Sequence, residues 1–300
     1  MATVLLSGAS GFIGSRLARA LTADGHRVVA LSRRAASPDN IHWDPGSNQL
    51  DATRLEALAP DVVFNLAGEP IAQRWTAERR QAIRASRVNG TSLLAQTLAG
   101  VRQRPRVMVS GSAIGYYGAH RGDELLTESS SAGRDFLAVT TADWEAATVA
   151  ARDAGIRVVL PRTGIVLSPD GGALQRMLPP FEMGGGGRLG DGQQWMSWIS
   201  MEDTIRALRF LMDSDRLAGP VNCVAPNPVR NADFAAALGQ VLHRPAVVPV
   251  PAFALRLLFG TMADHTILAS QRVAPEKLAG AGFEFRHPRL DEALRSELRR

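Results

Sequence analysis

The stretch that decides the fold lies at residues 2–25 and reads ATVLLSGASGFIGSRLARALTADG. Residues 2–7 form a short apolar run, as in a strand buried on both faces of a parallel sheet. Gly8 ends this run. Apolar side chains then recur at helical spacing until Gly25, at positions Ile13, Leu17, Ala20 and Leu21. The stretch therefore predicts a strand, a glycine-rich turn and a helix in direct succession.

The same alternation of apolar strands and helices continues over the first half of the chain. Further strands are predicted at residues 28–31, 61–66, 106–110 and 157–160. Helices are predicted at residues 13–23, 76–99 and 136–154. Strands that alternate with helices in this way form βαβ units, a parallel sheet and right-handed crossovers. Residues 1–165 are therefore expected to form an α/β cofactor domain, a Rossmann-type doubly wound parallel sheet.

The second half of the chain has a looser pattern. Residues 168–192 are rich in Gly and Pro, and a loop of this length is expected to line a ligand site. Residues 193–225 contain a predicted helix (201–212) and a predicted strand (220–224), and we expect them to return to the main sheet. Beyond them the sequence predicts helices separated by Pro-containing turns. Residues 166–300 are therefore expected to form a smaller, mainly helical substrate lobe.

The composition excludes several classes of protein. The 34 basic and 29 acidic residues are spread along the chain and no basic run is interleaved with aromatic residues, so no nucleic-acid partner is expected. Cys223 is the only cysteine, which indicates a reducing compartment, and the six histidines lack the spacing of a metal site. Neither a signal peptide nor an apolar stretch of about 18 residues is found. The sequence predicts a cytoplasmic protein without a membrane partner.

The glycine-rich turn of the opening stretch has the spacing of a dinucleotide phosphate loop. Gly8 permits the tight turn, Gly11 lets the backbone approach a pyrophosphate, and Gly14 lets the helix pack closely against the strand. The amides at the start of the helix then face the anion. Because the turn lies between a predicted strand and a predicted helix, its context favours a dinucleotide cofactor over a turn without a ligand.

The end of the second predicted strand selects between NAD and NADP. In NAD-binding proteins an acidic side chain about 20 residues after the glycine motif accepts hydrogen bonds from the ribose 2′-hydroxyl. Here that place holds Ser32, Arg33 and Arg34. An arginine suits a 2′-phosphate, and no acidic residue is present there to repel it. The sequence favours NADP (NADPH), the alternative being that the two arginines are solvated surface charges.

Several motifs beyond the glycine turn carry a family resemblance. They read NLAGEPI at 65–71, SRVNGT at 86–91, DWE at 143–145, RTGIVL at 162–167, SWI at 197–199 and PEKL at 275–278. With the glycine spacing they resemble the extended short-chain dehydrogenase/reductases, the nucleotide-sugar epimerase group, and more closely the atypical epimerase-family proteins. That family carries a C-terminal segment of unknown function. The resemblance covers nearly the whole chain and implies nucleotide binding on a Rossmann fold.

The resemblance also implies a set of cofactor-binding residues. It assigns the 2′-phosphate of the cofactor to Ser32 and Arg33. It assigns the pyrophosphate to the residues of the glycine turn, Gly8, Gly11, Phe12, Ile13 and Gly14. The adenine and ribose side is assigned to one segment, Leu66, Ala67, Gly68 and Glu69. Arg87 is expected to reach the cofactor, and Arg162 to lie beside the nicotinamide. For both of these arginines, a surface or interdomain salt bridge stays the alternative.

The catalytic centre departs from the pattern of the short-chain dehydrogenases. That pattern pairs a Tyr with a Lys four residues later, which lowers the pKa of the phenol. Lys277 is the only lysine, and Tyr116 and Tyr117 are the only tyrosines, so the chain contains no such pair. Ser112 occupies the position of the family's serine, and the two tyrosines near it are the candidate proton donors. An aromatic wall of the pocket is their alternative role, and the carboxylates of the DWE motif rank behind them.

Two functions follow from these observations. The first is an NADP(H)-binding, epimerase-like oxidoreductase that lacks the Tyr-x-x-x-Lys pair and acts on a small molecule, such as a sugar nucleotide, between the lobes. The second is a non-catalytic NADP-binding protein with a regulatory or partner-binding role. The missing pair favours the second function, whereas Ser112, Arg162 and the Gly-rich stretch favour the first. The substrate and the oligomeric state stay open.

Overall fold

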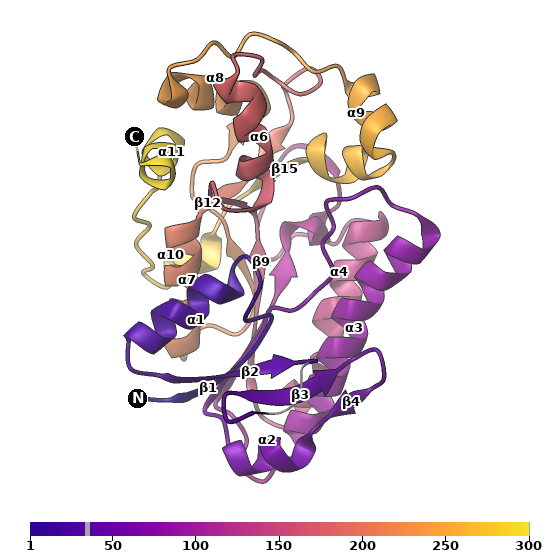
Figure 1. Cartoon of the computed structure of the whole chain (residues 1–300), viewed down its shortest axis with the longest axis vertical. Coiled ribbons are helices and arrows are strands. Elements are labelled where there is room, and N and C mark those ends of the chain that lie inside the picture. Colours follow the sequence, from indigo (N-terminus) through magenta and orange to yellow (C-terminus); the bar gives the residue numbers. More distant parts are fainter. Residues whose placement is uncertain (34–36, 300) are drawn as a thin grey trace.

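The computed structural model describes residues 1–33 and 37–299, with a parallel sheet at its centre (Figure 1). The strand order is β13-β9-β6-β5-β1-β2-β3-β4, and β7 pairs with β9 beside this path. The strands are β1 (Thr3–Ser7), β2 (Arg27–Ser32), β3 (Asn40–Asp44), β4 (Gln49–Leu50), β5 (Val62–Asn65), β6 (Val107–Ser110), β7 (Ser112–Ala113), β9 (Arg157–Thr163) and β13 (Gly219–Cys223). Among the described strands of this sheet, only the β3–β4 pair is antiparallel. The predicted Rossmann-type sheet is confirmed.

The strand order reverses beside β1, and this reversal fixes where a ligand can bind. The chain first moves outward from β1 through β2 and β3, and later continues on the other side of β1 through β5, β6 and β9. The carboxyl ends of β1 and β5 therefore lie next to each other while their connections diverge. In open α/β sheets, ligands bind at such a switch point.

Helices cover both faces of the sheet. One face is covered by α1 (Gly14–Ala23) and α7 (Met201–Asp213). The other face is covered by α2 (Ala52–Leu58), α3 (Ala77–Gly100) and α5 (Val149–Asp153). Along β1, Val4 and Leu6 pack toward the first face and Leu5 toward the second, because successive strand side chains alternate. The apolar runs of the sequence are therefore strands buried on both sides.

The helix predicted at residues 136–154 is two helices, α4 (Phe136–Ala146) and α5. The Thr148 hydroxyl donates a hydrogen bond to the carbonyl oxygen of Glu145 at 2.7 Å. Such a side-chain bond competes with the helical backbone ladder. The prediction of one continuous helix was wrong at this break.

The stretch predicted as a loop at residues 168–192 contains a helix, α6 (Gly172–Glu182). Its buried side chains share one helical face and are Leu174, Leu178 and Phe181. Pro179 and Pro180 lie in the last turn of the helix and have no backbone N–H, so they donate no helical hydrogen bond to the carbonyl oxygens of Gln175 and Arg176. The Gly and Pro content hid this periodicity, and the prediction of a loop throughout was wrong.

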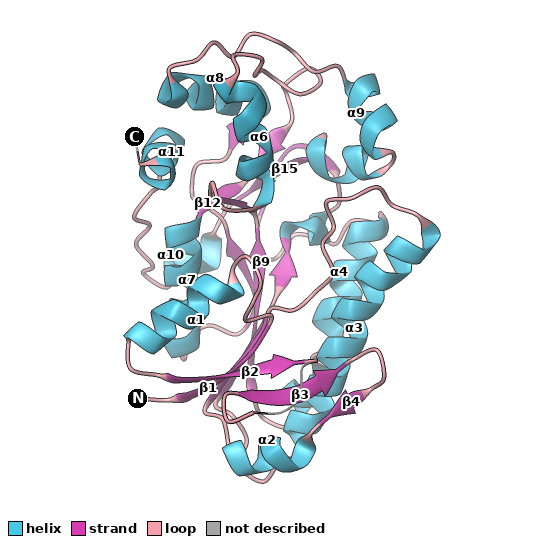
Figure 2. Cartoon of the chain, in the orientation of Figure 1, coloured by secondary structure: helices cyan, strands magenta, loops and turns pink. Residues whose placement is uncertain are grey.

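The C-terminal part is mainly helical, and most of it lies beyond the carboxyl ends of the central strands, whereas α10 lies beside α7 (Figures 1 and 2). Its helices are α8 (Asn231–Leu242), α9 (Ala252–Phe259), a π-helix at Ala263–Ile267, α10 (Glu276–Gly280) and α11 (Leu290–Leu298). Three small sheets join it, β8 (His120–Leu126) with β15 (Ser270–Val273), β10 (Ile165–Leu167) with β12 (Trp198–Ser200), and β11 (Trp195–Met196) with β14 (Val229–Arg230). Sequence analysis missed these pairs, because most of their strands are too short for a period-2 pattern. No described helix is long and apolar enough to cross a membrane.

The C-terminal part shares a hydrophobic core with the central sheet. β13 lies at the edge of that sheet, beside β9. Leu278 of α10 and Phe283 pack into the same cluster as Val4 and Leu17. The two parts of the chain are therefore joined by apolar packing as well as by the backbone.

Candidate cofactor and catalytic site

The glycine turn after β1 has no room for a side chain at Gly8 or at Gly14. Gly8 has φ +73°, and a Cβ there would lie 2.9 Å from the backbone nitrogen of Ala67. A Cβ on Gly14 would lie 2.1 Å from the carbonyl oxygen of Gly8. The amide of Gly11 closes the turn by donating to that same oxygen at 2.9 Å. Glycine is therefore required at both positions, because any other residue would clash with the neighbouring backbone.

The start of α1 follows directly and is anchored to the segment before α6. Ile13 is the N-cap residue, and no side chain caps the first turn. A Cβ on Gly171 would lie 2.3 Å from the ring of Phe12, so the ring packs flat against this glycine. Arg16 donates to the carbonyl oxygen of Phe12 at 3.1 Å and pairs with Asp170. Sequence analysis did not predict the ion pair between Arg16 and Asp170, because the two residues lie 154 positions apart.

The residues predicted to bind the 2′-phosphate lie at the end of β2. Ser32 is the last residue of β2, and Arg33 follows it with an exposed side chain. Arg34 lies outside the described residues. Because β2 runs parallel to β1, both residues lie at the edge of the sheet that also carries the glycine turn. Their position is compatible with the predicted contact.

A buried polar network holds the segment after β5. Ser7 donates to the side-chain oxygen of Asn65 at 2.7 Å, and the Asn65 amide donates to Thr91 at 2.8 Å and to Ser110 at 3.1 Å. The backbone amides of Leu66 and Ala67 donate to the Ser7 hydroxyl at 3.0 and 3.2 Å. Fully satisfied buried networks of this kind make a site rigid. The segment assigned to the adenine and ribose is thus fixed at the switch point.

Arg87 of α3 lies against the same segment. It donates to the carbonyl oxygen of Glu69 at 3.0 Å, and its Cζ lies 5.2 Å from the centroid of the Trp144 ring. A Cβ on Gly68 would lie 3.1 Å from that Cζ. Burial lowers the pKa of Arg87 to about 10, although the charge of Glu69 opposes this shift. Arg87 therefore stays cationic at neutral pH and supplies a positive charge beside the predicted cofactor position.

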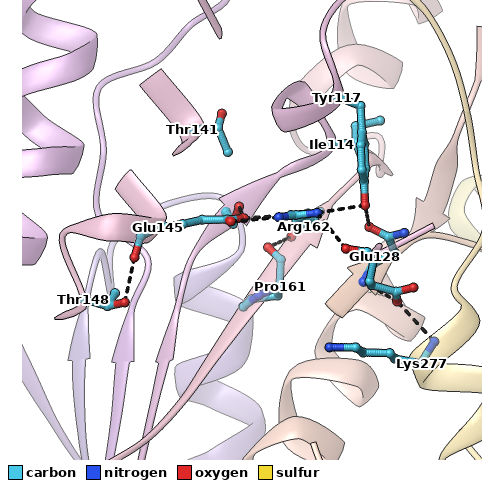
Figure 3. A network of polar contacts seen from close by, with 12 residues as sticks. Ile114, Tyr117, Glu128, Thr141, Glu145, Thr148, Pro161, Arg162 and Lys277 are labelled. Atoms are coloured by element: carbon cyan, nitrogen blue, oxygen red, sulfur yellow. Dashed lines mark hydrogen bonds and ion pairs between the residues drawn. The ribbon is translucent and has the colours of Figure 1, made fainter. Parts of the chain in front are cut away.

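Ser112 is bonded to a buried chain of charged and polar groups that includes Glu145 and Arg162, and Figure 3 shows these two side chains. Its hydroxyl donates to Glu145 Oε1 at 2.6 Å. Arg162 donates to both carboxylate oxygens of Glu145, from Nε at 2.8 Å and from Nη2 at 2.9 Å. The side chains of Arg162 and Glu145 are only 3% and 10% exposed. The arrangement follows from the fold, since β7 pairs with β9 so that Ser112 faces Arg162 and α4 supplies Glu145.

Arg162 also fixes Tyr117, one of the two predicted proton donors. Arg162 Nη1 donates to the Tyr117 hydroxyl at 3.1 Å, and that hydroxyl donates to Asn222 Oδ1 at 2.7 Å. Tyr117 is 0% exposed, and burial raises the pKa of its phenol although Arg162 opposes this shift. The Tyr117 hydroxyl is thus enclosed by the protein. The role of Asn222 was missed, because it lies 105 positions from Tyr117.

Tyr116 has a different environment from its neighbour. The Cζ of Arg162 lies 3.4 Å from the centroid of the Tyr116 ring, so the guanidinium stacks on the ring face. Tyr116 is only partly buried. Lys277 does not reach either tyrosine, because its Nζ donates to the carbonyl oxygen of Ala218 at 3.3 Å. Arg162 is therefore the cation placed against these phenols in the described structure.

Arg162 forms a buried ion pair with Glu145 within residues 1–165, and not the surface or interdomain salt bridge that the sequence left as its alternative role. Burial acts to lower the pKa of Arg162, but the hydrogen bonds and charge of Glu145 outweigh it and raise the pKa above its usual range. The guanidinium is thus a permanent cation paired within the protein. No group of His, Cys, Asp and Glu side chains among the described residues could hold a metal ion.

A parallel sheet with a glycine-rich turn at its switch point defines a dinucleotide-binding α/β protein. A model of the NAD dependent epimerase/dehydratase family matches residues 4–223, and a model of a domain of unknown function, DUF1731, matches residues 250–297. The chain belongs to the NAD dependent epimerase/dehydratase family. The resemblance drawn from the sequence motifs, including the C-terminal segment, is confirmed.

Similar proteins cover nearly the whole chain. The chain is 45% identical over 295 residues to Epimerase family protein Mb2239 of Mycobacterium bovis, with 98% of this chain and 96% of that protein covered. The crystal structure of human epimerase family protein SDR39U1 (isoform 2) with NADPH is similar at a TM-score of 0.90 and 32% identity, covering 99% of each chain. A UDP-glucuronic acid 4-epimerase from Bacillus cereus, with UDP-glucuronic acid and NAD, shares the fold at a TM-score of 0.77 and 18% identity, covering 98% of this chain and 97% of that chain.

Proposed function

We propose that the chain binds NADPH at the switch point of the sheet and catalyses hydride transfer with a small-molecule substrate. The observation that carries this proposal is the glycine turn, in which a Cβ on Gly14 would lie 2.1 Å from the oxygen of Gly8. Glycines in such a turn let its backbone approach a pyrophosphate. The human relative crystallised with NADPH supports the same cofactor.

Different residues of the chain would bind different groups of the cofactor. The glycine turn and the first amides of α1 would hold the pyrophosphate, because a helix N-terminus carries partial positive charge. Ser32 and Arg33 would hold the 2′-phosphate, and Arg87 adds a further positive charge near Gly68. When bound, NADPH supplies the hydride. We place the substrate between residues 1–165 and the lobe formed by residues 166–300.

Ser112 would orient the oxygen of the substrate that gains or loses a proton. Its single hydrogen is donated to the Glu145 carboxylate, so its oxygen is left as an acceptor. An acceptor at this point binds the hydroxyl form of a substrate through the hydroxyl hydrogen. The Glu145–Arg162 pair keeps the Ser112 side chain in this orientation.

Tyr116 would exchange the proton with the substrate. Arg162 stacks on the face of the Tyr116 ring, with its Cζ 3.4 Å from the ring centroid, and this contact holds the ring in place at the site. Tyr117 would support the site from within the core, since its hydroxyl is bonded to Arg162 and Asn222.

The choice of cofactor can be tested by titration with NADPH and NADH, followed by the quenching of tryptophan fluorescence. We expect Arg33→Ala to weaken NADPH binding by about 10- to 100-fold, which corresponds to the loss of one or two charge-assisted hydrogen bonds. NADH binding should change little. Arg27→Ala, at the opposite end of β2, is the matched control and should leave both affinities unchanged. Equal affinity of the wild-type protein for the two cofactors would contradict a 2′-phosphate site.

The catalytic assignment can be tested by following NADPH oxidation with a panel of sugar nucleotides, aldehydes and quinones. For any substrate turned over, Tyr116→Phe should lower kcat by about 100-fold or more, because it removes the proton donor. Ser112→Ala should also lower activity, and both variants should keep the wild-type affinity for NADPH. Activity that survives both substitutions unchanged would rule out this site.

A second function, a non-catalytic NADPH-binding protein, is favoured by one observation. The only lysine is bonded to Ala218 and lies away from both tyrosines, so the Tyr-Lys pair is not rebuilt in space. This function predicts tight NADPH binding without turnover across the whole panel. The oxidoreductase predicts turnover of at least one class of substrate.

A further inference from the structure

A group of apolar side chains in the C-terminal part faces solvent. Ten large apolar side chains of the described residues are exposed, and six of these lie directly after α6 or within residues 247–258. Their exposed fractions range from 47% to 80%. We call these six residues the apolar patch: Met183, Val247, Val248, Phe253, Leu257 and Leu258. Single exposed apolar residues are common on soluble proteins, whereas a larger group of them marks an interaction surface.

The two segments that carry the apolar patch lie beside each other. The amide of Val248 donates to the carbonyl oxygen of Gly186 at 3.0 Å. Arg244 donates to the carbonyl oxygen of Glu182, next to Met183, at 3.0 Å. Figure 1 shows α9 and the loop before it at the end of the molecule opposite α2. The six side chains therefore lie at the same end of the molecule.

The outer face of α9 is not needed to hold the helix in place. Leu255 is buried, and Phe259 packs against the apolar cluster that contains Trp75. Phe253 and Leu257 lie four positions apart on the opposite face of the helix and are 71% and 75% exposed. The inner face therefore anchors α9, and the outer face is available for a partner.

The charged side chains around the apolar patch are mainly arginines. Residues 244–261 contain no acidic residue. Five arginines lie within or beside the two segments: Arg74, Arg80, Arg188, Arg244 and Arg256. A Cβ on Gly260, at the end of α9, would lie 3.8 Å from Arg74 Nε, and Arg80 donates to Thr261 at 3.0 Å. The carboxylates of the same region are fewer: Glu182, Asp191 and Asp264, the last of which pairs with Arg256.

This excess of positive charge distinguishes between the partners that an apolar surface can have. In a twofold dimer the apolar patch would meet its own copy, so that arginines would face arginines. An anionic surface complements the arginines instead. Apolar and aromatic side chains accompanied by arginines are typical of protein segments that lie in the interface of a lipid bilayer.

We propose that the apolar patch binds the surface of an anionic lipid bilayer. Phe253 and Leu257 would enter the boundary between headgroups and acyl chains, and the arginines would bind the lipid phosphates. This proposal goes beyond the proposed function and does not depend on it. It differs from the sequence prediction of no membrane partner, because that prediction depended on a search for a spanning stretch, which a surface contact does not require.

Cosedimentation of the full chain with lipid vesicles tests the proposal. At low salt the wild type should bind vesicles of phosphatidylcholine and phosphatidylglycerol at least tenfold more tightly than vesicles of phosphatidylcholine alone, because only the former carry negative charge. Phe253→Ser combined with Leu257→Ser should weaken this binding at least tenfold, since both side chains lose their burial in the bilayer. Arg244→Ala should weaken it about fivefold, and high salt should release the wild type.

Val139→Ser combined with Val149→Ser is the matched control, because it removes two exposed apolar side chains from α4 and α5, outside the apolar patch. This variant should bind as the wild type does. Circular dichroism should show that both double variants are folded, since all four side chains face solvent. Equal binding to the two kinds of vesicle, or equal binding by the wild type and the Phe253/Leu257 variant, overturns the proposal. A dimer in analytical ultracentrifugation that this variant disrupts, without vesicle binding by the wild type, also overturns it and assigns the apolar patch to a second copy.

Discussion

At the scale of single residues, the centre of the candidate site is a buried ion pair. Glu145 and Arg162 form two parallel hydrogen bonds and are almost fully shielded from water. Ser112 and Tyr117 use the remaining donors and acceptors of the pair, so its groups are satisfied within the protein. Removing one member of such a pair leaves the other charge buried and unpaired. The free-energy cost of that unpaired charge is larger than the net stabilisation that the intact pair provides.

Glu145→Gln should therefore destabilise the protein by about 3 to 5 kcal/mol, measured by urea denaturation. Asp143→Asn is the matched control, because Asp143 lies on the same helix and pairs with Arg84 at the same 2.8 Å, but the two side chains are 36% and 50% exposed. Its effect should stay below about 1 kcal/mol. Equal losses of stability in the two variants would show that burial does not distinguish the two pairs.

At the scale of elements, a carboxylate from the last helix stabilises the start of α7. Glu297 of α11 accepts hydrogen bonds from the backbone amides of Met201 and Glu202 at 2.8 and 3.3 Å. Burial raises the pKa of the Glu297 carboxyl, and these two bonds oppose the shift without cancelling it. The Glu297 carboxyl, which lies at the contact between α11 and α7, is therefore protonated more readily in the folded chain than in the unfolded chain.

This shift predicts a dependence of stability on pH. Because the pKa of Glu297 is higher in the folded chain than in the unfolded chain, the folded chain binds more protons between the two values. The contribution of Glu297 to stability is thus fully present below the unfolded pKa and is lost as the pH rises through the folded pKa. Urea denaturation between about pH 4 and pH 7 should show the wild type losing stability relative to Glu297→Gln as the pH rises.

Glu292→Gln, an exposed position on the same helix, is the control for this experiment. The difference in stability between this variant and the wild type should depend much less on pH than the difference for Glu297→Gln. A Glu297→Gln curve that stays parallel to the wild-type curve would contradict the predicted shift.

At the scale of the whole molecule, the C-terminal segment is part of the central core. Phe283 is buried and packs edge-on against Phe210 and Phe285, with ring centroids 5.4 and 4.9 Å apart. It belongs to the same apolar cluster as the strands β1, β5 and β6. The segment matched by the DUF1731 model therefore contributes directly to the stability of the cofactor-binding sheet.

Phe283→Ala should lower the free energy of unfolding by about 3 to 5 kcal/mol, as expected for a large core side chain. Tryptophan fluorescence and far-UV circular dichroism should report the same single transition in urea, because one core joins both parts of the chain. Phe253→Ala, at a side chain that is 71% exposed on α9, should change stability by no more than about 0.5 kcal/mol. A separate early transition in Phe283→Ala would show that the C-terminal part unfolds on its own.

The sequence by itself determined the class of fold, the glycine turn and the absence of the usual catalytic pair. Each of these depends on a local pattern or on a count: apolar runs alternate with helical periods, three glycines lie within seven residues, and one lysine lies far from two adjacent tyrosines. The preference for NADPH also came from a local motif, at the end of β2. The helix α6 was not predicted, because its prolines and glycines masked the helical spacing of its buried side chains.

Only the tertiary structure decided which of the neighbouring tyrosines is enclosed and which carboxylate holds Ser112. Tyr116 and Tyr117 are alike in sequence, yet Arg162 stacks on one ring and bonds the hydroxyl of the other. Glu145 ranked behind both tyrosines until the fold placed it 2.6 Å from Ser112. Such contacts join positions far apart in the chain, so they are set by the path of the backbone through the sheet, and no local spacing of residues encodes them.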